Sequence, residues 1–399
     1  MPRLHGFQKK ELLEIYRKMV LARRLDEKQL IMLKQGKAFF HIGCSGHEAA
    51  QMAAAVNMNP GQDWAYPYYR DAAFCLGLGM TGREQLLSFL ARKDDPNSGG
   101  RQMPQHYGHK DLRIVSQSSP TGTQFLQAVG CAMSRKWEET KEIVYVSSGE
   151  GSSSEGEFHE ALNWASREKL PVIFHIEDNE YAISVHISEQ TAGSSVFALV
   201  AGYKNLSRYD VDGTNFFETN LAFQQAIERA QKGKGPSVIV SHVVRLLSHS
   251  SSDDQRKYRS KDELNKDLNK DPIIKFETDC IQAKIATSKD FEKIRDEVKK
   301  QVDTDAEWAD QQDHPDQNTA LDHVYTNQPA LKETTFNIKN DKIVLVDAIN
   351  HAMAEEMERD EKIVIYGQDI ADPKGGVFTA TRGLRSEERR VGKECRSRW

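Results

Sequence analysis

The sequence predicts an α/β fold in which a mostly parallel sheet is flanked by helices. Three observations carry this prediction: a β-branched run at residues 143–148 that ends in a Gly-x-Gly turn, a helical pattern of apolar residues at 158–165, and a second apolar run at 172–176. A strand, a turn, a helix and a second strand in this order form the repeating unit of parallel α/β proteins.

The ends of these two strands carry the residues with the clearest chemistry. Glu150 follows the first strand and Asn179 follows the second, and a right-handed crossover places both strand ends on one edge of the sheet. Gly149 and Gly151 allow the backbone to approach an anion, which the free N–H groups of the next helix attract. A carboxylate, an amide and a backbone carbonyl near Tyr181 are hard oxygen ligands that suit Mg²⁺ beside phosphate oxygens. The sequence therefore predicts a metal–diphosphate site.

Two other interpretations of the Gly-x-Gly turn compete with this one. In a dinucleotide site, Glu177 or Asp178 would bind a ribose hydroxyl, but the next glycine is Gly156, so the spacing is not G-x-G-x-x-G. A plain structural turn is the more frequent meaning of a lone Gly-x-Gly. The amide of Asn179 at the end of the next strand favours the metal site over both.

Length, charge and cysteine content exclude several classes of protein. The 399 residues can form more than one core. The net charge of −5, without a basic patch, predicts no nucleic-acid partner, and no apolar run approaches the ~20 residues of a membrane helix. The five cysteines have no metal-binding spacing, which indicates free thiols in a reducing compartment. No signal or transit sequence is evident at the start, so we expect a cytoplasmic protein.

The N-terminal half supplies further candidates. Apolar spacing predicts a helix over residues 9–34. In the stretch 66–71, Arg70 is a natural bidentate partner of phosphate and Tyr69 adds a hydroxyl, although a surface Arg–Asp pair is the alternative. Residues 116–124 form a loop dense in Ser and Thr before a helix that begins near residue 125, which is also typical of helix capping.

The remainder of the chain contains one more candidate and a second unit. A helix is expected at 217–232 and a strand at 236–241, and the strand leads to His249 in a Ser-rich loop. A lone His there would usually be a surface residue, but it follows a strand of the same sheet, and imidazole can donate or accept a proton near neutral pH. Solvated helices are expected at 260–310. A second unit is predicted with strands at 342–346 and 362–366 around a helix.

Taken together, these motifs resemble those of 2-oxo acid dehydrogenase E1 components. Gly-Glu-Gly at 149–151, Ser-Glu-Gly-x-x-His-Glu-Ala at 154–161 and Asp-Asn-x-Tyr-Ala-Ile-Ser at 178–184 match the thiamine-diphosphate motif of that family. Glu150 replaces the usual Asp, as in branched-chain members, and Asp178 replaces the first Asn of the usual pair. The resemblance implies a three-layer thiamine-diphosphate-binding fold, with Mg²⁺ held by Glu150, Asn179 and Tyr181.

The resemblance extends to the loops around the predicted site. Gly-Arg-Gln-Met-Pro-x-His-Tyr-Gly at 100–108 and Ser-Ser-Pro-x-x-Thr-Gln at 118–124 recur in branched-chain E1 relatives. It implies a K⁺ ion held by Ser118, Pro120, Thr123 and Gln124. It implies that thiamine diphosphate is bound by Tyr69, Arg70, Ser119, Thr121, Gly149, Glu150, Gly151, Ser152, Asn179 and His249. By the match to Arg-x-x-x-His-Ser-x-Ser-Asp-Asp, His249 is also catalytic and transfers protons at the substrate carbonyl and during acyl transfer.

The implied domain organisation is that of an α–β fusion. Residues 1–310 resemble the E1 α-type domain, 311–339 form a linker, and 340–384 resemble the truncated start of the pyrimidine-binding E1 β-type domain. Residues 385–399 shift abruptly to a basic composition and resemble a translated sequencing-adapter oligonucleotide, so we interpret them as a non-native tail.

The resemblance also implies the reaction and the partners. The expected enzyme is an acyl-transferring oxidoreductase that decarboxylates branched-chain 2-oxo acids such as 3-methyl-2-oxobutanoate. It passes the acyl group to a lipoylated E2 acyltransferase and works as an oligomer with a β-type domain. A β-side glutamate that activates the cofactor in the family is absent here, so the chain alone is expected to be inactive. The alternatives are a pyruvate or acetoin dehydrogenase E1, or a non-catalytic cofactor- or partner-binding remnant.

Overall fold

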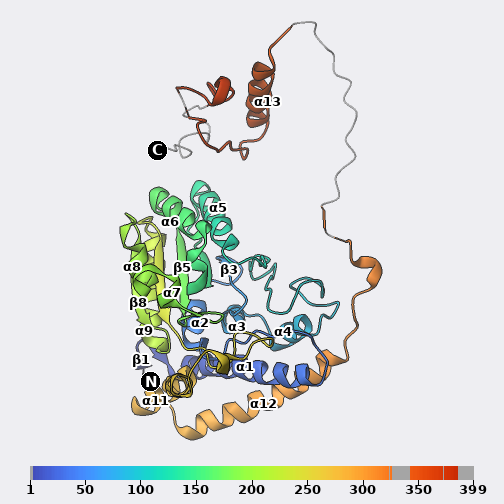
Figure 1. Cartoon of the computed structure of the whole chain (residues 1–399), viewed down its shortest axis with the longest axis vertical. Coiled ribbons are helices and arrows are strands. Elements are labelled where there is room, and N and C mark those ends of the chain that lie inside the picture. Colours follow the sequence, from blue (N-terminus) through green and yellow to red (C-terminus); the bar gives the residue numbers. More distant parts are fainter. Residues whose placement is uncertain (1–2, 323, 326–341, 372, 385–399) are drawn as a thin grey trace. The chain divides into compact units, whose positions relative to one another are not determined.

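The computed structural model describes residues 3–322, 324–325, 342–371 and 373–384 (Figure 1). The chain divides into two compact units, Met1–Leu321 and Asp322–Trp399, and each is described by itself. The tail predicted at 385–399 lies outside the described residues, as does most of the second half of the predicted linker.

A five-stranded parallel sheet forms the centre of the first unit, in the order β3-β4-β5-β9-β8. Its strands are β3 (Trp64–Tyr66), β4 (Val144–Gly149), β5 (Val172–Asp178), β9 (Ser237–His242) and β8 (Ser207–Asp212). Two short antiparallel pairs accompany the sheet: β1 (Arg3–Leu4) with β2 (Phe7–Gln8), and β6 (Tyr181–Ala182) with β7 (Val185–His186). The predicted parallel α/β class is confirmed.

Helices cover both faces of the sheet and produce three layers (Figure 1). The helices of this unit are α1 (Lys9–Lys34), α2 (Glu48–Ala55), α3 (Ala72–Leu78), α4 (Gly82–Phe89), α5 (Thr123–Trp137), α6 (Gly156–Glu168), α7 (Ile187–Gln190), α8 (Val196–Leu199), α9 (Phe216–Gln231), α10 (Lys261–Leu268), α11 (Pro272–Gln282) and α12 (Ser288–Asp310). No described helix has the length and apolar character needed to cross a membrane.

Strand alternation divides the interior into two cores. On β4, Val144 and Val146 face the core that contains Phe158 of α6, whereas Tyr145 faces the other core and stacks on Phe74 with ring centroids 4.2 Å apart. Both faces of the strand are therefore apolar, as expected for a parallel sheet covered by helices on each side. The polar residues of β4, Ser147 and Ser148, come at its carboxyl end.

The second unit differs from its prediction. Its helix α13 (Leu345–Arg359) begins inside the stretch that we expected to be a strand, and residues 362–366 form no strand. Both strand predictions are wrong. The described part of this unit contains no strand with which either apolar run could pair, and a strand cannot satisfy its backbone groups alone.

Candidate active site

The predicted acid and amide meet at the carboxyl edge of the sheet. The parallel register pairs Gly149 of β4 with Glu177 of β5, so the residues that follow them leave the sheet side by side. The backbone N–H of Asn179 donates to Oε2 of Glu150 at 3.2 Å. The crossover argument therefore placed these two residues correctly.

Two oxygen atoms at this edge are buried without a partner. Among the described residues, neither Oε1 of Glu150 nor Oδ1 of Asn179 has a hydrogen-bond donor, and Glu150 is only 1% exposed. Burial, followed by the nearby charge of Asp178, raises the pKa of Glu150 to about 7. A divalent cation would satisfy both oxygens and favour the ionised carboxylate.

The donor set is poor in charged ligands. No group of three or more His, Cys, Asp or Glu side chains is arranged to hold a metal ion within the described part of the chain. A metal ion at Glu150 would therefore depend on neutral oxygens and on an anionic ligand. That combination is typical of Mg²⁺ bound through a phosphorylated molecule.

Tyr181 can contribute only through its backbone. Its hydroxyl donates to Oε1 of Glu263 at 2.7 Å, and its ring lies 5.0 Å from the guanidinium of Arg259. The phenol is therefore engaged away from Glu150 and Asn179. The sequence predicted that a backbone carbonyl near Tyr181 binds Mg²⁺. The contacts of the Tyr181 side chain are compatible with this prediction.

The Gly-x-Gly turn is shaped by close packing. A Cβ on Gly151 would lie 2.8 Å from Cβ of Ala182 in β6, whereas one on Gly149 would come no closer than 3.8 Å to another group, the ring of Tyr68. Gly151 thus lets β6 approach the turn, a reason that differs from the anion contact that we expected. Ser152 is buried in the short helix Glu150–Ser154, and its carbonyl accepts from the N–H of Glu155 at 3.1 Å.

Cations gather on the neighbouring strand ends. Arg70, which follows β3, donates from Nη1 to the carbonyl of Gly43 at 2.6 Å and from Nη2 to the carbonyl of His249 at 3.2 Å. Its Nε is buried without a partner in the described residues. The ring of Tyr69 lies 5.4 Å from the same guanidinium and 5.9 Å from the imidazole of His249. The structure therefore brings these three predicted residues together.

The sequence predicted no role for a second buried cation, Arg245, which is the Arg of the Arg-x-x-x-His motif that contains His249. This side chain is 1% exposed and donates from Nη2 to the carbonyl of Ile183 at 3.0 Å and to the hydroxyl of Tyr258 at 2.8 Å. Burial, then the charge of Arg70, lowers its pKa. The available signal was its position directly after the apolar run that continues β9.

His249 lies between these cations and is neutral at pH 7. Burial, then the charges of Arg70 and Arg245, lowers its pKa to about 4. Its backbone N–H donates to Oδ2 of Asp253 at 2.9 Å, which fixes the loop. At pH 7 the ring therefore carries one proton. This differs from the expectation that the ring both donates and accepts a proton near neutral pH.

The predicted K⁺ loop precedes α5. The hydroxyl of Thr123 donates to the carbonyl of Pro120 at 3.0 Å, and Gln124 accepts from the N–H of Gly122 at 3.1 Å. These oxygens already belong to one compact turn. Ser118 is partly buried on the same loop. Ser119 and Thr121 are exposed, and no hydrogen bond within the described chain connects either side chain to Glu150 or Arg70.

Glu177 does not face this site. It is fully buried on the other face of β5, where its Oε2 lies 2.5 Å from Nδ1 of His47 and accepts from Nε2 of Gln51 at 2.9 Å. Burial raises its pKa to about 7. A ribose hydroxyl could not reach it, so the dinucleotide alternative loses one of its two acidic candidates.

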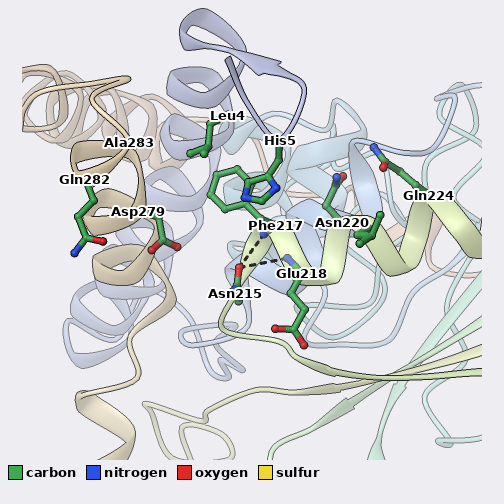
Figure 2. A pocket seen from close by; sticks show the side chains of 11 residues that line it. Leu4, His5, Asn215, Phe217, Glu218, Asn220, Gln224, Asp279, Gln282 and Ala283 are labelled. Carbon is green, nitrogen blue, oxygen red and sulfur yellow. Dashed lines mark hydrogen bonds between the residues drawn. The ribbon is translucent and has the colours of Figure 1, made fainter. Parts of the chain in front are cut away.

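A cavity of about 550 Å³ lies elsewhere in the unit (Figure 2). The N-terminal hairpin, α9 and α11 form its walls, and the ring of His5 stacks on Phe217 with centroids 4.8 Å apart. Asn215 in its wall caps α9 by accepting from the N–H groups of Phe217 and Glu218 at 3.1 and 3.3 Å. None of the predicted site residues lines this cavity.

An acid, an amide and buried cations at the carboxyl edge of a parallel sheet define an α/β protein that can hold a metal ion with a phosphorylated ligand. Comparison with known proteins identifies the family. Residues 16–318 match the family described as "Dehydrogenase E1 component", and the chain belongs to that family.

Several relatives are E1 α subunits. The 2-oxoisovalerate dehydrogenase subunit alpha of Bacillus subtilis (strain 168) is 38% identical over 320 residues, which cover 80% of this chain and 97% of the relative. The 3-methyl-2-oxobutanoate dehydrogenase subunit alpha of Mycobacterium tuberculosis (strain CDC 1551 / Oshkosh) is 32% identical over 269 residues, 66% of this chain and 69% of the relative. The mitochondrial 2-oxoisovalerate dehydrogenase subunit alpha of Homo sapiens is 32% identical over 326 residues, 81% of this chain and 72% of the relative.

Proposed function

We propose that this chain is the α-type part of a thiamine-diphosphate-dependent E1 that oxidatively decarboxylates branched-chain 2-oxo acids of the 3-methyl-2-oxobutanoate type. The names of its relatives support the substrate class. The observation that carries the proposal is the pair of buried oxygens without partners, Oε1 of Glu150 and Oδ1 of Asn179, on neighbouring strand ends. Family membership alone would not require this pair to point at a shared ligand.

In this proposal, Glu150, Asn179 and the backbone carbonyl of Tyr181 hold Mg²⁺. Burial disfavours the ionised form of Glu150. A cation that displaces the proton of this carboxyl group stabilises the ionised form by direct charge attraction. Asn179 adds a neutral oxygen that is already held by the turn. The remaining positions of the octahedron are left for phosphate oxygens and water.

The cofactor is proposed to lie across the strand ends, against the cations. Thiamine diphosphate, when bound, supplies the electron sink for loss of CO₂. Arg70 and Tyr69 are positioned to orient the diphosphate, and Gly149, Gly151 and Ser152 form the turn beneath it. Ser119 and Thr121 are assigned to the same set through the loop that carries them.

His249 is the proposed catalytic residue. Its Nδ1 lies 3.5 Å from Nη2 of Arg70, which leaves Nε2 to exchange a proton with the substrate. Because Nδ1 accepts from Arg70, the single proton of the neutral ring lies on Nε2, from which it can be donated to the substrate. An anionic ligand beside Arg70 offsets the positive charge that now lowers its pKa, so a bound diphosphate makes protonation of His249 easier.

A K⁺ ion is proposed to support the loop before α5. Ser118, Pro120, Thr123 and Gln124 offer hydroxyl, carbonyl and amide oxygens there, and two of these oxygens already lie 3.0 Å apart. Neutral oxygens suit an alkali cation because they impose little charge. Holding this loop would place Ser119 and Thr121 against the cofactor.

The proposed organisation follows the α–β fusion expected from the sequence. Residues 1–310 are the α-type domain, 311–339 the linker and 340–384 the start of a β-type domain. A β-type partner domain, an oligomer and a lipoylated E2 acyltransferase complete the proposed cytoplasmic system. We expect the 399-residue chain alone to show no turnover, and decarboxylation by the purified chain would contradict this.

Calorimetric titration of thiamine diphosphate into the full chain, with and without Mg²⁺, tests the proposal. We expect binding that requires Mg²⁺ and disappears in the Glu150→Gln variant. Binding that is equally tight without the metal would overturn the proposed site. With a β-type subunit added, faster turnover of pyruvate than of 3-methyl-2-oxobutanoate would instead assign the chain to pyruvate oxidation.

A further inference from the structure

Arg245 is a buried cation whose charge no side chain of the described chain neutralises directly. Its Nε and Nη1 are both buried and have no hydrogen-bond partner among the residues that the structure describes, whereas Nη2 donates to the carbonyl of Ile183 and the hydroxyl of Tyr258. A buried guanidinium normally forms paired bonds with a carboxylate. Here two of its three nitrogens are left with N–H groups and nothing to donate to.

The nearest acids are already committed to other groups. Oδ2 of Asp253 accepts from the hydroxyl of Tyr258 at 2.5 Å and from the backbone N–H of His249 at 2.9 Å. The second arginine, Arg70, bonds the carbonyls of Gly43 and His249, the imidazole of His249 and the side chain of Tyr69. Among the described residues, no hydrogen bond joins either cation of the site to a carboxylate.

The neighbours of Arg245 place it beside the proposed metal site. Ile183, which accepts from Nη2, is two residues beyond Tyr181, and the ring of Tyr181 lies 5.7 Å from the guanidinium. The charges of Arg245 and Arg70 act on the same imidazole, that of His249. Arg245 therefore lies beside the segment that follows the turn after β5, and it shares His249 as a neighbour with Arg70.

We propose that Arg245 binds the diphosphate of the cofactor as a second guanidinium, through its free Nε and Nη1. These two N–H groups point to different sides of the planar guanidinium, so each can bond a different phosphate oxygen of the diphosphate. Two positive charges held close together in the interior repel each other, and a dianion between them removes this cost. The inference rests on the proposed function and adds a residue to its site.

The test uses inorganic pyrophosphate with Mg²⁺, titrated by calorimetry into the full chain. Arg245→Met keeps an unbranched apolar stem and removes the charge, and we expect roughly 10- to 100-fold weaker pyrophosphate binding, the loss typical of charge-assisted hydrogen bonds. Arg245→Lys retains the charge without the fork, so it should lose less. Unchanged affinity in Arg245→Met would overturn the inference.

Tyr258→Phe is the matched control. It removes one of the two partners of Nη2 and the link to Asp253 but leaves the cation in place, and we expect pyrophosphate affinity within a few-fold of the wild type. An equal loss in Tyr258→Phe and Arg245→Met would show that Arg245 acts by holding the loop, which overturns the inference. Thiamine without phosphate, used as a second probe, should bind both variants as it binds the wild type.

The outcomes separate this inference from the proposed function. If the wild-type chain binds neither pyrophosphate nor thiamine diphosphate in the presence of Mg²⁺, both fall. If the wild type binds and Arg245→Met binds equally well, only the role of Arg245 falls. Circular dichroism of each variant confirms that the folded chain is compared, and Arg245→Lys provides the measurement if Arg245→Met does not fold.

Discussion

Replacing Glu150 with Gln should stabilise the ligand-free protein while it abolishes metal binding. Gln has nearly the same shape, and its side-chain oxygen can still accept the N–H of Asn179. It cannot ionise, so it avoids placing a negative charge in a position that is 1% exposed. The variant therefore separates the two consequences of the same buried carboxylate.

The magnitude follows from the pKa of Glu150. Burial raises it from the ordinary 4.5 to about 7. A group with a raised pKa contributes stability that is fully present below 4.5 and is lost as the pH rises through 7. The difference of about 2.5 pKa units, at roughly 1.4 kcal/mol each, corresponds to roughly 3 kcal/mol lost between pH 4.5 and pH 8. The Gln variant does not incur this loss.

Urea unfolding of both proteins between pH 5 and pH 8 measures the effect. We expect the free energy of unfolding of Glu150→Gln to exceed that of the wild type increasingly as the pH rises. Mg²⁺ with thiamine diphosphate should then stabilise only the wild type, by about 1.4 kcal/mol for each tenfold excess of ligand over Kd. Glu189→Gln, at an exposed position, is the control and should show neither effect. A stability difference independent of pH would refute the argument.

Three further predictions concern other positions. Gly151→Ala should lower stability by roughly 1–3 kcal/mol because its Cβ would lie 2.8 Å from a methyl group of β6, whereas Gly156→Ala, with nothing within 4 Å, should be neutral or slightly stabilising in thermal unfolding. The pKa of His242, which Asp178 and Asp210 raise to about 9, should fall in Asp178→Asn, as measured by NMR. The stability that protonated His242 contributes to the folded protein is fully present below pH 6.5 and is lost as the pH rises through 9. The pKa of His249, about 4 in the free protein, should rise on binding of Mg²⁺–thiamine diphosphate, and an unchanged titration would contradict the proposed site.

The sequence was sufficient where chain order alone determines position. The helix at Lys9–Lys34 has the predicted bounds, and its start carries a capping box between Gln8 and Glu11. The meeting of Glu150 with Asn179 follows from parallel strands joined by one crossover. Both predictions use local periodicity and a topological rule, and neither requires knowledge of distant packing.

Elements that depend on distant neighbours were not predictable in this way. Strand β3 has only three residues, Trp64–Tyr66, and is a strand because it pairs with β4. Strand β8 at the opposite edge is polar and half-buried, so it lacks an apolar pattern. Successive side chains of a strand point to opposite faces of the sheet, so the sequence could have placed Glu177 and its neighbour Asp178 on opposite faces. This would have tested, from the sequence alone, whether both acids can bind one dinucleotide.

The distribution of charge explains why these residues form a site and not a salt bridge. Glu150 is a buried acid, and Arg70 and Arg245 are buried cations, yet no ion pair joins them among the described residues. The charge of Arg245 lowers the pKa of Glu150, but less than burial raises it. Pairing them directly would satisfy the protein and leave nothing for a ligand. Kept apart, the acid matches a metal ion and the cations match an anion. A metal–diphosphate complex carries both charges in that order, so it can satisfy the two halves of the site at once.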